Sequence, residues 1–512
     1  MPSVVEHFPV LVVVVSLLSA ITILIAGWIN RKTAWYISLA TLLGQFIASL
    51  FILHHVMTVG SIRYRLGGWA PPWGIEYVMD ALNAYVLVVL LFLGLVCVIY
   101  SKRNIEHELP QKVVSFYTIY QLLITGLCGI TVTGDIFNMY VFLEITSLSA
   151  YALIASRGKI ALKASFTYLV LGSIGACFFL LGVGFLYAVT GSLNIQDLSL
   201  LLPPFYGNRV VLAAFVFFLV GLSIKMALFP LHTWLPDAHA FAPAEISAML
   251  SGIIIEVSTY AFIRVAFSVF TLRFLRLLPI FDILSWLGAV AIIIGSVLAI
   301  TQVNLKRMLA YSSVANMGYI VLALGLSTSA RTLPWGGLNP ALMHILNHAL
   351  MKGCLFLVAG AFIYKADLWY IKDFVGLGRK MPYTCAAFVI AAISMIGVPP
   401  SVGFVSKLYI ILASIEAKKF FFVAVLLLSS LLNLVYFWRV IETMYMKRGK
   451  EQDHSHASHG SHVQREEIPF GMLSPIWVLA SLCIIMGILW LANVPTPILN
   501  QVNSMFGLDM KP

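Results

Sequence analysis

Long uninterrupted apolar segments restrict this sequence to a membrane-spanning helical fold. About fourteen segments are long enough to cross a bilayer, from Phe8–Trp28 to Pro475–Ala492. Roughly twenty helical residues span the hydrocarbon core, and a helix satisfies its own backbone hydrogen bonds there. The segments are continuous and do not alternate in polarity, which argues against strands. The sequence therefore predicts an all-α polytopic membrane protein.

Composition and charge support this fold and exclude an ordinary soluble domain. Of the 512 residues, 61% are hydrophobic and only 10% are charged. The net charge of +11 does not indicate nucleic-acid binding, because the basic residues follow the topology. With the amino terminus outside, roughly twice as many Lys and Arg fall in inner loops as in outer loops. This predicts a multi-pass membrane protein with both termini outside.

The cysteines and the histidine-rich stretch do not predict a cofactor. The six cysteines stand singly in apolar segments, without CxxC, haem or iron–sulfur spacing, so we expect inert packing residues. The polar stretch Lys447–Glu467 contains four histidines that could bind Zn²⁺ or Ni²⁺ only loosely, since no cysteine or fixed carboxylate accompanies them. They are His454, His456, His459 and His462. We interpret the stretch as a polar cytoplasmic linker, and we expect neither a metal nor a cofactor.

Ionisable residues inside the apolar segments are the strongest indication of function. Glu144 stands near the middle of GDIFNMYVFLEITSLSAYAL, where a carboxylate is costly unless it is compensated. Lys225 lies five residues before Pro230, and this proline predicts a helix break directly after Lys225. An intramembrane Glu–Lys pair keeps both groups ionised, and breaking it would release a proton. We therefore expect Glu144 and Lys225 to be functional partners.

A second interrupted helix is predicted at Pro399–Pro400, shortly before Lys407. Two Pro-broken helices about five segments apart, each near a lysine, are typical of transporters built from repeats. A basic side chain at a helix end can instead extend to the membrane surface, and this interpretation suits Arg439 and Lys306. It does not suit Lys407, which lies beside the predicted break.

The segment ALMHILNHALMKGCLFL contains a stripe of ionisable residues. His344, His348 and Lys352 recur every four residues, so they share one helix face within the bilayer. The stripe favours a proton relay over a purely structural network. The HxxxH spacing also matches a metal site, but Lys352 and Asn347 are poor companions for zinc.

Several motifs resemble those of the antiporter-like proton-conducting membrane subunits. They are TGDIFNMYVFLEITSLSAYAL, KMALFPLHTWLPDAHAFAPAEISAMLSGI, NLKRMLAYSSVANMGYI, HILNHALMKGCLFLVAG and GVPPSVGFVSKLYI. This family includes large membrane subunits of respiratory complex I, the D subunit of Mrp-type Na⁺/H⁺ antiporters and relatives in membrane-bound hydrogenases. The resemblance covers roughly Gly68–Lys447, and the sequence looks most like the Mrp D subunit or its hydrogenase-type counterpart.

The resemblance implies fourteen helices, with the fourth to eighth and the ninth to thirteenth forming two inverted five-helix repeats. It also implies that Glu144 and Lys225 form a coupling pair and that Lys352 and Lys407 continue the proton path. The expected divisions are an N-terminal three-helix segment (1–112), a first repeat (113–270), a second repeat (271–447) and a final part with the histidine-rich loop and last helix (448–512).

Glu256 departs from the pattern that the resemblance implies. The family usually has a lysine at this position of the eighth helix, so a central cation has become an acid. Arg264 lies two turns further along the same face of the helix, and we expect Arg264 or Lys225 to approach Glu256 and keep it ionised. Either this half-channel works differently, for example with Na⁺ on the carboxylate, or its conduction has been lost.

The leading functional hypothesis is an ion-translocating subunit of a multi-subunit membrane complex, of the Mrp, complex I or hydrogenase type. It would move H⁺ or exchange H⁺ for Na⁺, and it would do no redox chemistry itself. A structural scaffold with a degenerate ion path is the alternative that Glu256 supports. A stand-alone solute carrier is less favoured, because the titratable groups form a linear file and do not gather around one cavity.

Overall fold

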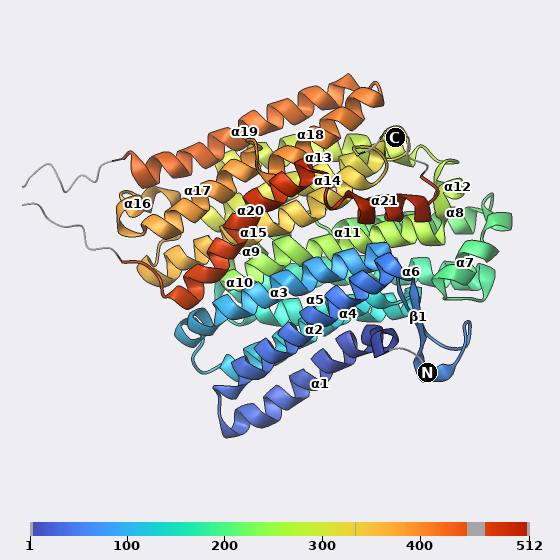
Figure 1. Ribbon diagram of the computed structural model, residues 1–512, viewed down its shortest axis with the longest axis horizontal. Coiled ribbons are helices and arrows are strands. Elements are labelled where there is room, and N and C mark those ends of the chain that lie inside the picture. Colours follow the sequence, from blue (N-terminus) through green and yellow to red (C-terminus); the bar gives the residue numbers. More distant parts are fainter. Residues whose placement is uncertain (1–3, 333, 448–465, 509–512) are drawn as a thin grey trace, which may run out of the picture.

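The computed structural model describes residues 4–332, 334–447 and 466–508, and most of these residues lie in long helices that run side by side (Figure 1). Within the described ranges, 12 helices are long and apolar enough to cross a membrane. The prediction of an all-α polytopic membrane protein is therefore confirmed. The histidine-rich stretch around 454–462 lies outside the described residues.

Eleven of these spans in the described part of the chain are single long helices. They are α1 (Phe8–Ile29), α2 (Thr33–Thr58), α3 (Ala81–Glu108), α4 (Val113–Val132), α5 (Ile136–Ala155), α6 (Ile160–Thr190), α13 (Ile280–Thr301), α14 (Leu305–Leu326), α15 (Asn339–Ala366), α19 (Phe420–Tyr445) and α20 (Phe470–Leu491). The remaining long span is a series of α10 (Ala244–Met249), η4 (Leu250–Ile254), α11 (Ile255–Arg264) and η5 (Val265–Val269).

Two further segments are each divided into a pair of shorter helices, and small elements lie at the ends of the bundle. The pairs are α8 (Arg209–Lys225) with α9 (Leu235–Phe241), and α17 (Pro382–Ile396) with α18 (Val402–Glu416). The small elements are η1 (Val4–His7), β1 (Ile62–Arg65), η2 (Leu66–Gly68), β2 (Glu76–Met79), α7 (Ile195–Leu201), η3 (Pro203–Phe205), α12 (Thr271–Leu275), η6 (Ile371–Asp373), α16 (Leu377–Lys380) and α21 (Thr496–Met505).

The first broken helix ends where the sequence predicts. Helix α8 terminates at Lys225, five residues before Pro230. Proline lacks the backbone N–H that would continue the ladder, and the last carbonyls of a helix need other donors. The indole of Trp234 supplies one, since its Nε1–H donates to the Ile224 carbonyl at 3.0 Å. A side chain of the protein therefore supplies a donor to a carbonyl at the break, as buried backbone at membrane depth requires.

The second break uses a charged donor. Helix α17 ends at Ile396 and α18 begins at Val402, with Pro399–Pro400 between them. Lys407 Nζ donates to the carbonyl oxygens of Met395 at 2.8 Å and Ile396 at 3.1 Å. A cation at the carbonyl end of a helix is also favoured by the helix dipole. Lys407, which belongs to α18, thus satisfies the carbonyl end of α17. Both Pro-broken helices are confirmed.

The span that contains Glu256 is irregular and central. Its α10–η5 series is buried throughout (Figure 1, green). The segments η4 and η5, on either side of α11, are π-helical. Such turns are rare, and they occur preferentially at functional sites. The series packs against α15, the helix of the histidine stripe.

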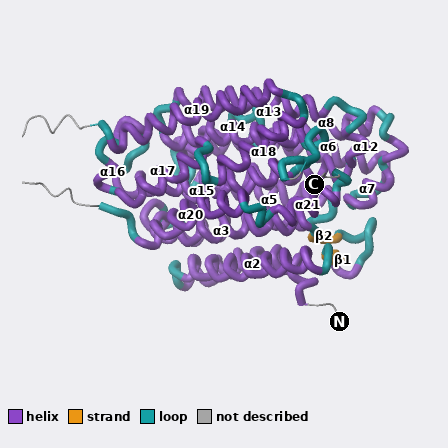
Figure 2. The backbone as a smooth tube through the Cα atoms, turned by 45° about the horizontal axis from the view of Figure 1, so that its top comes forward, coloured by secondary structure: helices purple, strands orange, loops and turns teal. Residues whose placement is uncertain are grey.

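The two ends of the bundle differ in character. At one end, β1 pairs antiparallel with β2, with Arg65 opposite Glu76, near α7, α12 and α21. We call this the hairpin end; Figure 2 shows the two strands together beside the end of α2. The opposite end bears α16, and we call it the α16 end (Figure 1). The count of fourteen spans, the inverted repeats and the divisions at 112, 270 and 447 stay predictions.

Candidate functional site

The predicted contact between Glu144 and Lys225 is present. Lys225 Nζ lies 3.2 Å from Glu144 Oε1 and 2.6 Å from Ser147 Oγ. Glu144 and Ser147 are three residues apart on α5, so they share a face. The Lys225 side chain is only 4% exposed, whereas Glu144 is 25% exposed. A buried ammonium is therefore held at the C-terminal end of α8 by one carboxylate and one hydroxyl.

Glu256 has a different partner from the one expected. Neither Lys225 nor Arg264 forms an ion pair with it in the described part of the chain; instead its Oε1 lies 2.5 Å from His348 Nδ1. Both side chains are almost completely buried. Lys225 is already engaged by Glu144, and α10 and η4, which precede Glu256, pack on α15. The prediction that Lys225 or Arg264 compensates Glu256 is wrong.

Arg264 lies on another side of α11. Eight residues at 3.6 per turn rotate a side chain by about 80° beyond two full turns and move it about 12 Å along the axis. Arg264 therefore reaches the start of α3, where it pairs with Asp80 Oδ1 at 2.7 Å and donates to the Asn83 side-chain oxygen. Asp80 also accepts from backbone N–H groups as the N-cap of α3.

The histidine stripe lies along one face of α15, as its spacing predicts. The rings of His344 and His348 are stacked, with centroids 6.3 Å apart. His344 Nδ1 contacts Ser406 Oγ at 2.9 Å, and its Nε2 contacts Asn316 Oδ1 at 3.1 Å. Within the described ranges, no three His, Cys, Asp or Glu side chains form a group able to hold a metal.

Lys352, at the end of the stripe, is joined to Lys407 by successive polar contacts. Its Nζ donates to the Leu309 carbonyl at 2.7 Å and to Ser312 Oγ at 2.8 Å. The contacts continue from Ser312 to Tyr436 (3.0 Å), Asn433 (2.9 Å), the Met395 carbonyl (3.2 Å) and Lys407 (2.8 Å). They fix both ammonium groups relative to one another. The carbonyl oxygens near Lys407 accept hydrogen bonds and cannot themselves relay a proton.

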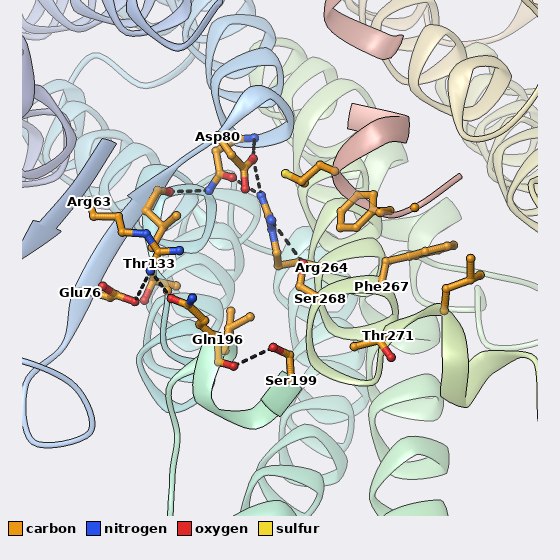
Figure 3. Close-up of a pocket in the computed structure, with 18 of the residues that line it drawn as sticks. Arg63, Glu76, Asp80, Thr133, Gln196, Ser199, Arg264, Phe267, Ser268 and Thr271 are labelled. Carbon is orange, nitrogen blue, oxygen red and sulfur yellow. Dashed lines mark hydrogen bonds and ion pairs between the residues drawn. The ribbon is translucent and has the colours of Figure 1, made fainter. Parts of the chain in front are cut away.

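A polar cavity of about 540 Å³ lies at the hairpin end. Arg63, Glu76, Asp80, Arg264 and Arg273 line it, and the Arg264 side chain points toward Asp80 (Figure 3). The carboxylates are paired: Glu76 lies 3.4 Å from the guanidinium of Arg63, and Asp80 is held by Arg264. The cavity is therefore lined by an ion pair that joins the start of α3 to α11, the helix that contains Glu256.

Residues 133–433 match the family described as "NADH:quinone oxidoreductase/Mrp antiporter, TM". The chain belongs to this family. It is 44% identical over 487 residues to NADH-quinone oxidoreductase subunit N of Desulforudis audaxviator, covering 94% of this chain and 96% of that protein. It is 31% identical over 448 residues to the D subunit of the Na⁺/H⁺ antiporter of Bacillus subtilis, covering 87% and 88%.

The antiporter-like fold is also found in a solved structure. A chain of the membrane-bound sulfane sulfur reductase, an archaeal respiratory membrane complex, superposes with a TM-score of 0.85 at 30% identity, over 98% of both chains. The recognised family is thus confirmed, and the chain is an antiporter-like membrane subunit. All the site residues predicted from the sequence fall within the matched residues 133–433.

Several polar groups of the buried network were not predicted from the sequence. Ser147 follows Glu144 by three residues, so helical spacing could have identified it. Asp80 precedes an apolar segment and looks like an ordinary N-cap, so nothing local indicates its pairing with Arg264. Ser312 and Tyr436 belong to distant segments, and only the packing of α14 against the later helices brings them together.

Lys306 is placed differently from the prediction. Its side chain does not extend to the membrane surface; it is 1% exposed, and its Nζ donates to the Ala242 carbonyl at 2.5 Å. The turn between α9 and α10 covers it, and this contact joins residues far apart in sequence. Arg439, in contrast, lies in the last two turns of α19, and its guanidinium caps the end of α13 by donating to the Ile300 and Gln302 carbonyls.

Proposed function

We propose that this chain is the ion-translocating subunit of a multi-subunit membrane complex, moving H⁺ or exchanging H⁺ for Na⁺. The observation that supports it is the Glu144–Lys225 contact at a helix break. At 3.2 Å, two unit charges interact with about 5 kcal/mol at an effective dielectric constant near 20. Moving one charge through 100 mV involves about 2.3 kcal/mol. The energy needed to separate the Glu144–Lys225 pair is therefore of the same order as the energy that a membrane potential supplies.

The path continues through the centre of the chain. Glu256 and His348 link the first half of the protein to the α15 stripe, and His344 and Lys352 extend it along that helix. Lys407, beside the second break, stands at the far end. An acid in place of the family lysine remains compatible with conduction, because a carboxylic acid beside an imidazole can give or take a proton as a cation would. This supports ion translocation over the scaffold alternative.

The orientation of this path follows from the basic residues. We assign the α16 end to the cytoplasm of a prokaryotic cell, because Arg157, Lys159, Arg379 and Lys380 gather there. Both termini and the hairpin end then lie outside, and the histidine-rich loop is cytoplasmic. The cavity at the hairpin end becomes the outward opening, closed at its base by Arg264 and Asp80.

The partners are other membrane subunits. The three relatives are named as parts of an NADH-quinone oxidoreductase, an Na⁺/H⁺ antiporter and a sulfane sulfur reductase complex. The three names indicate different driving reactions, but each describes part of a multi-subunit complex. We infer that this chain likewise moves ions only when assembled, with any redox reaction performed by other subunits.

The test is ion movement by the complete complex in sealed vesicles. Glu144→Ala should leave the complex assembled, as judged by co-purification, and abolish transport. Glu106→Ala, an exposed acid near the end of α3, is the matched control and should transport normally. Normal transport by an assembled Glu144→Ala complex would contradict the proposed role of the pair.

A further inference from the structure

A second carboxylate is buried near the α16 end, outside the path described above. Glu245 stands in the first turn of α10 and is 0% exposed. Its Oε2 accepts a hydrogen bond from Asn104 Nδ2 at 2.9 Å. Its Oε1 accepts none from the described part of the chain. A buried carboxylate oxygen without a donor destabilises a fold, so its presence calls for a ligand.

Other unpartnered polar atoms surround this oxygen. The Tyr100 hydroxyl and Asn104 Oδ1 also lack hydrogen-bond partners among the described residues. Both belong to α3, one turn apart, so they face the same side. A Cβ built on Gly360 would lie 2.7 Å from the Tyr100 hydroxyl and would also meet Ala244, the neighbour of Glu245. Three polar side chains thus converge with unused hydrogen-bonding capacity.

A polar route leads from this group to the α16 end. Tyr100, Asn104 and Glu108 recur every four residues on α3, and Glu108 lines a cavity of about 720 Å³ at that end. Arg157 also lines the cavity; it pairs with Glu108 and donates to the Ala242 carbonyl at 3.2 Å. That carbonyl belongs to the turn directly before α10. Glu245 therefore lies one layer beneath the cavity.

His239 connects the same region to the ion path. It is completely buried, and neither of its ring nitrogens has a partner in the described residues. Its ring stacks on Phe356 of α15, with centroids 4.6 Å apart. Phe356 lies one helical turn from Lys352, so His239 faces the side of α15 that bears the stripe. An imidazole with both nitrogens free can accept a proton on one and release it from the other.

We propose that Glu245 is the proton-binding site through which protons from the α16-end cavity reach His239 and then the Lys352 stripe. The carboxylate takes a proton from the cavity water, and the neutral imidazole takes it from the carboxylic acid. The inference rests on the proposed function of ion translocation. A proton suits the site better than Na⁺, because few oxygens converge on it and Lys306 of α14 donates to the Ala242 carbonyl of the turn directly before α10.

The charge of Glu245 depends on every titratable group that faces it. The neighbouring elements contribute Cys97, Tyr100 and Glu108 from α3, Tyr117 and Tyr120 from α4, Arg157 after α5 and Lys306 from α14. His239 of α9 lies beside the same turn, where its carbonyl accepts a hydrogen bond from Ser247 Oγ of α10. The cations favour the carboxylate, whereas burial and Glu108 favour the carboxylic acid.

The experiment compares Glu245→Gln with Glu467→Gln in the assembled complex. Glu467 lies at the same end, and its carboxylate is satisfied by Tyr383 and Thr384. Glu245→Gln should slow transport by at least about 10-fold and remove one step from its pH profile, and Glu245→Asp should restore part of the rate. The control should keep the wild-type profile. Purified wild-type complex should also show a pH-dependent carboxylic-acid infrared band that Glu245→Gln lacks.

The outcomes separate this inference from the proposed function. An assembled Glu245→Gln complex with the wild-type rate and pH profile overturns the input role while leaving ion translocation intact. A changed Na⁺ affinity with an unchanged pH profile also overturns it, since the site would then bind Na⁺. A wild-type complex that moves no ions contradicts the proposed function itself. If Glu245→Gln fails to assemble, the same transport test is made with Asn104→Leu, which removes the hydrogen bond to Glu245. The pH-dependent infrared band of the wild type is then the second measurement.

Discussion

Replacing Glu256 by glutamine removes the titratable proton of the buried pair and keeps its shape. The amide oxygen can still accept from His348 Nδ1, which now lies 2.5 Å from the carboxylate. A neutral hydrogen bond contributes about 0.5–1.5 kcal/mol, and glutamine keeps a hydrogen bond to His348, so the change should destabilise the fold by no more than about 1 kcal/mol. The complex should therefore still assemble and unfold only slightly earlier on heating.

Transport should respond much more strongly than stability. Glutamine cannot bind or release a proton, and loss of a positioned acid–base group typically costs about 100-fold or more in rate. The assay is ion movement in everted vesicles across a range of pH and Na⁺ concentrations. Glu256→Leu is the structural comparison: it leaves His348 Nδ1 unpaired, at a further cost of about 1–3 kcal/mol. Glu256→Lys should assemble, because His348 can accept from the new ammonium.

One result would refute this reasoning. If Glu256→Gln transports at the wild-type rate, with unchanged pH and Na⁺ dependence, the carboxylate is outside the path. The Glu256–His348 contact would then be structural, and conduction would have to be carried by His344, His348, Lys352 and Lys407.

Three further predictions concern the cavity, the link between the lysines and the orientation. Asp80→Asn should preserve the N-cap but release Arg264, and vesicles should then leak ions without a driving reaction; unchanged leakage would contradict an outward gate. Tyr436→Phe should destabilise the fold by about 1–2 kcal/mol and slow transport, whereas a wild-type rate would exclude this link from the path. In intact cells, impermeant maleimide should label Ser199→Cys and spare Ser458→Cys until lysis, and the reverse pattern would invert the assigned orientation.

Features that depend on local chemistry can be predicted from the amino-acid sequence. Span lengths follow from runs of apolar residues, and the break after Lys225 follows from a proline that cannot donate a backbone hydrogen bond. The stripe of His344, His348 and Lys352 follows from helical periodicity. Each of these depends on residues within a few turns of one another, so no knowledge of the packing is needed.

The choice of partner for each ionisable group depends on how the helices pack. Lys225, Arg264 and His348 are all plausible partners for Glu256, and the choice is made by the rotation of α11 and by the helix that lies beside it. A rotation of about 80° between Glu256 and Arg264 sends one side chain to α15 and the other to α3. Lys306 is likewise buried by a turn distant in sequence. Ion pairing requires contact within a few ångströms, and helix packing sets that distance, whereas local sequence sets only the face from which a side chain departs.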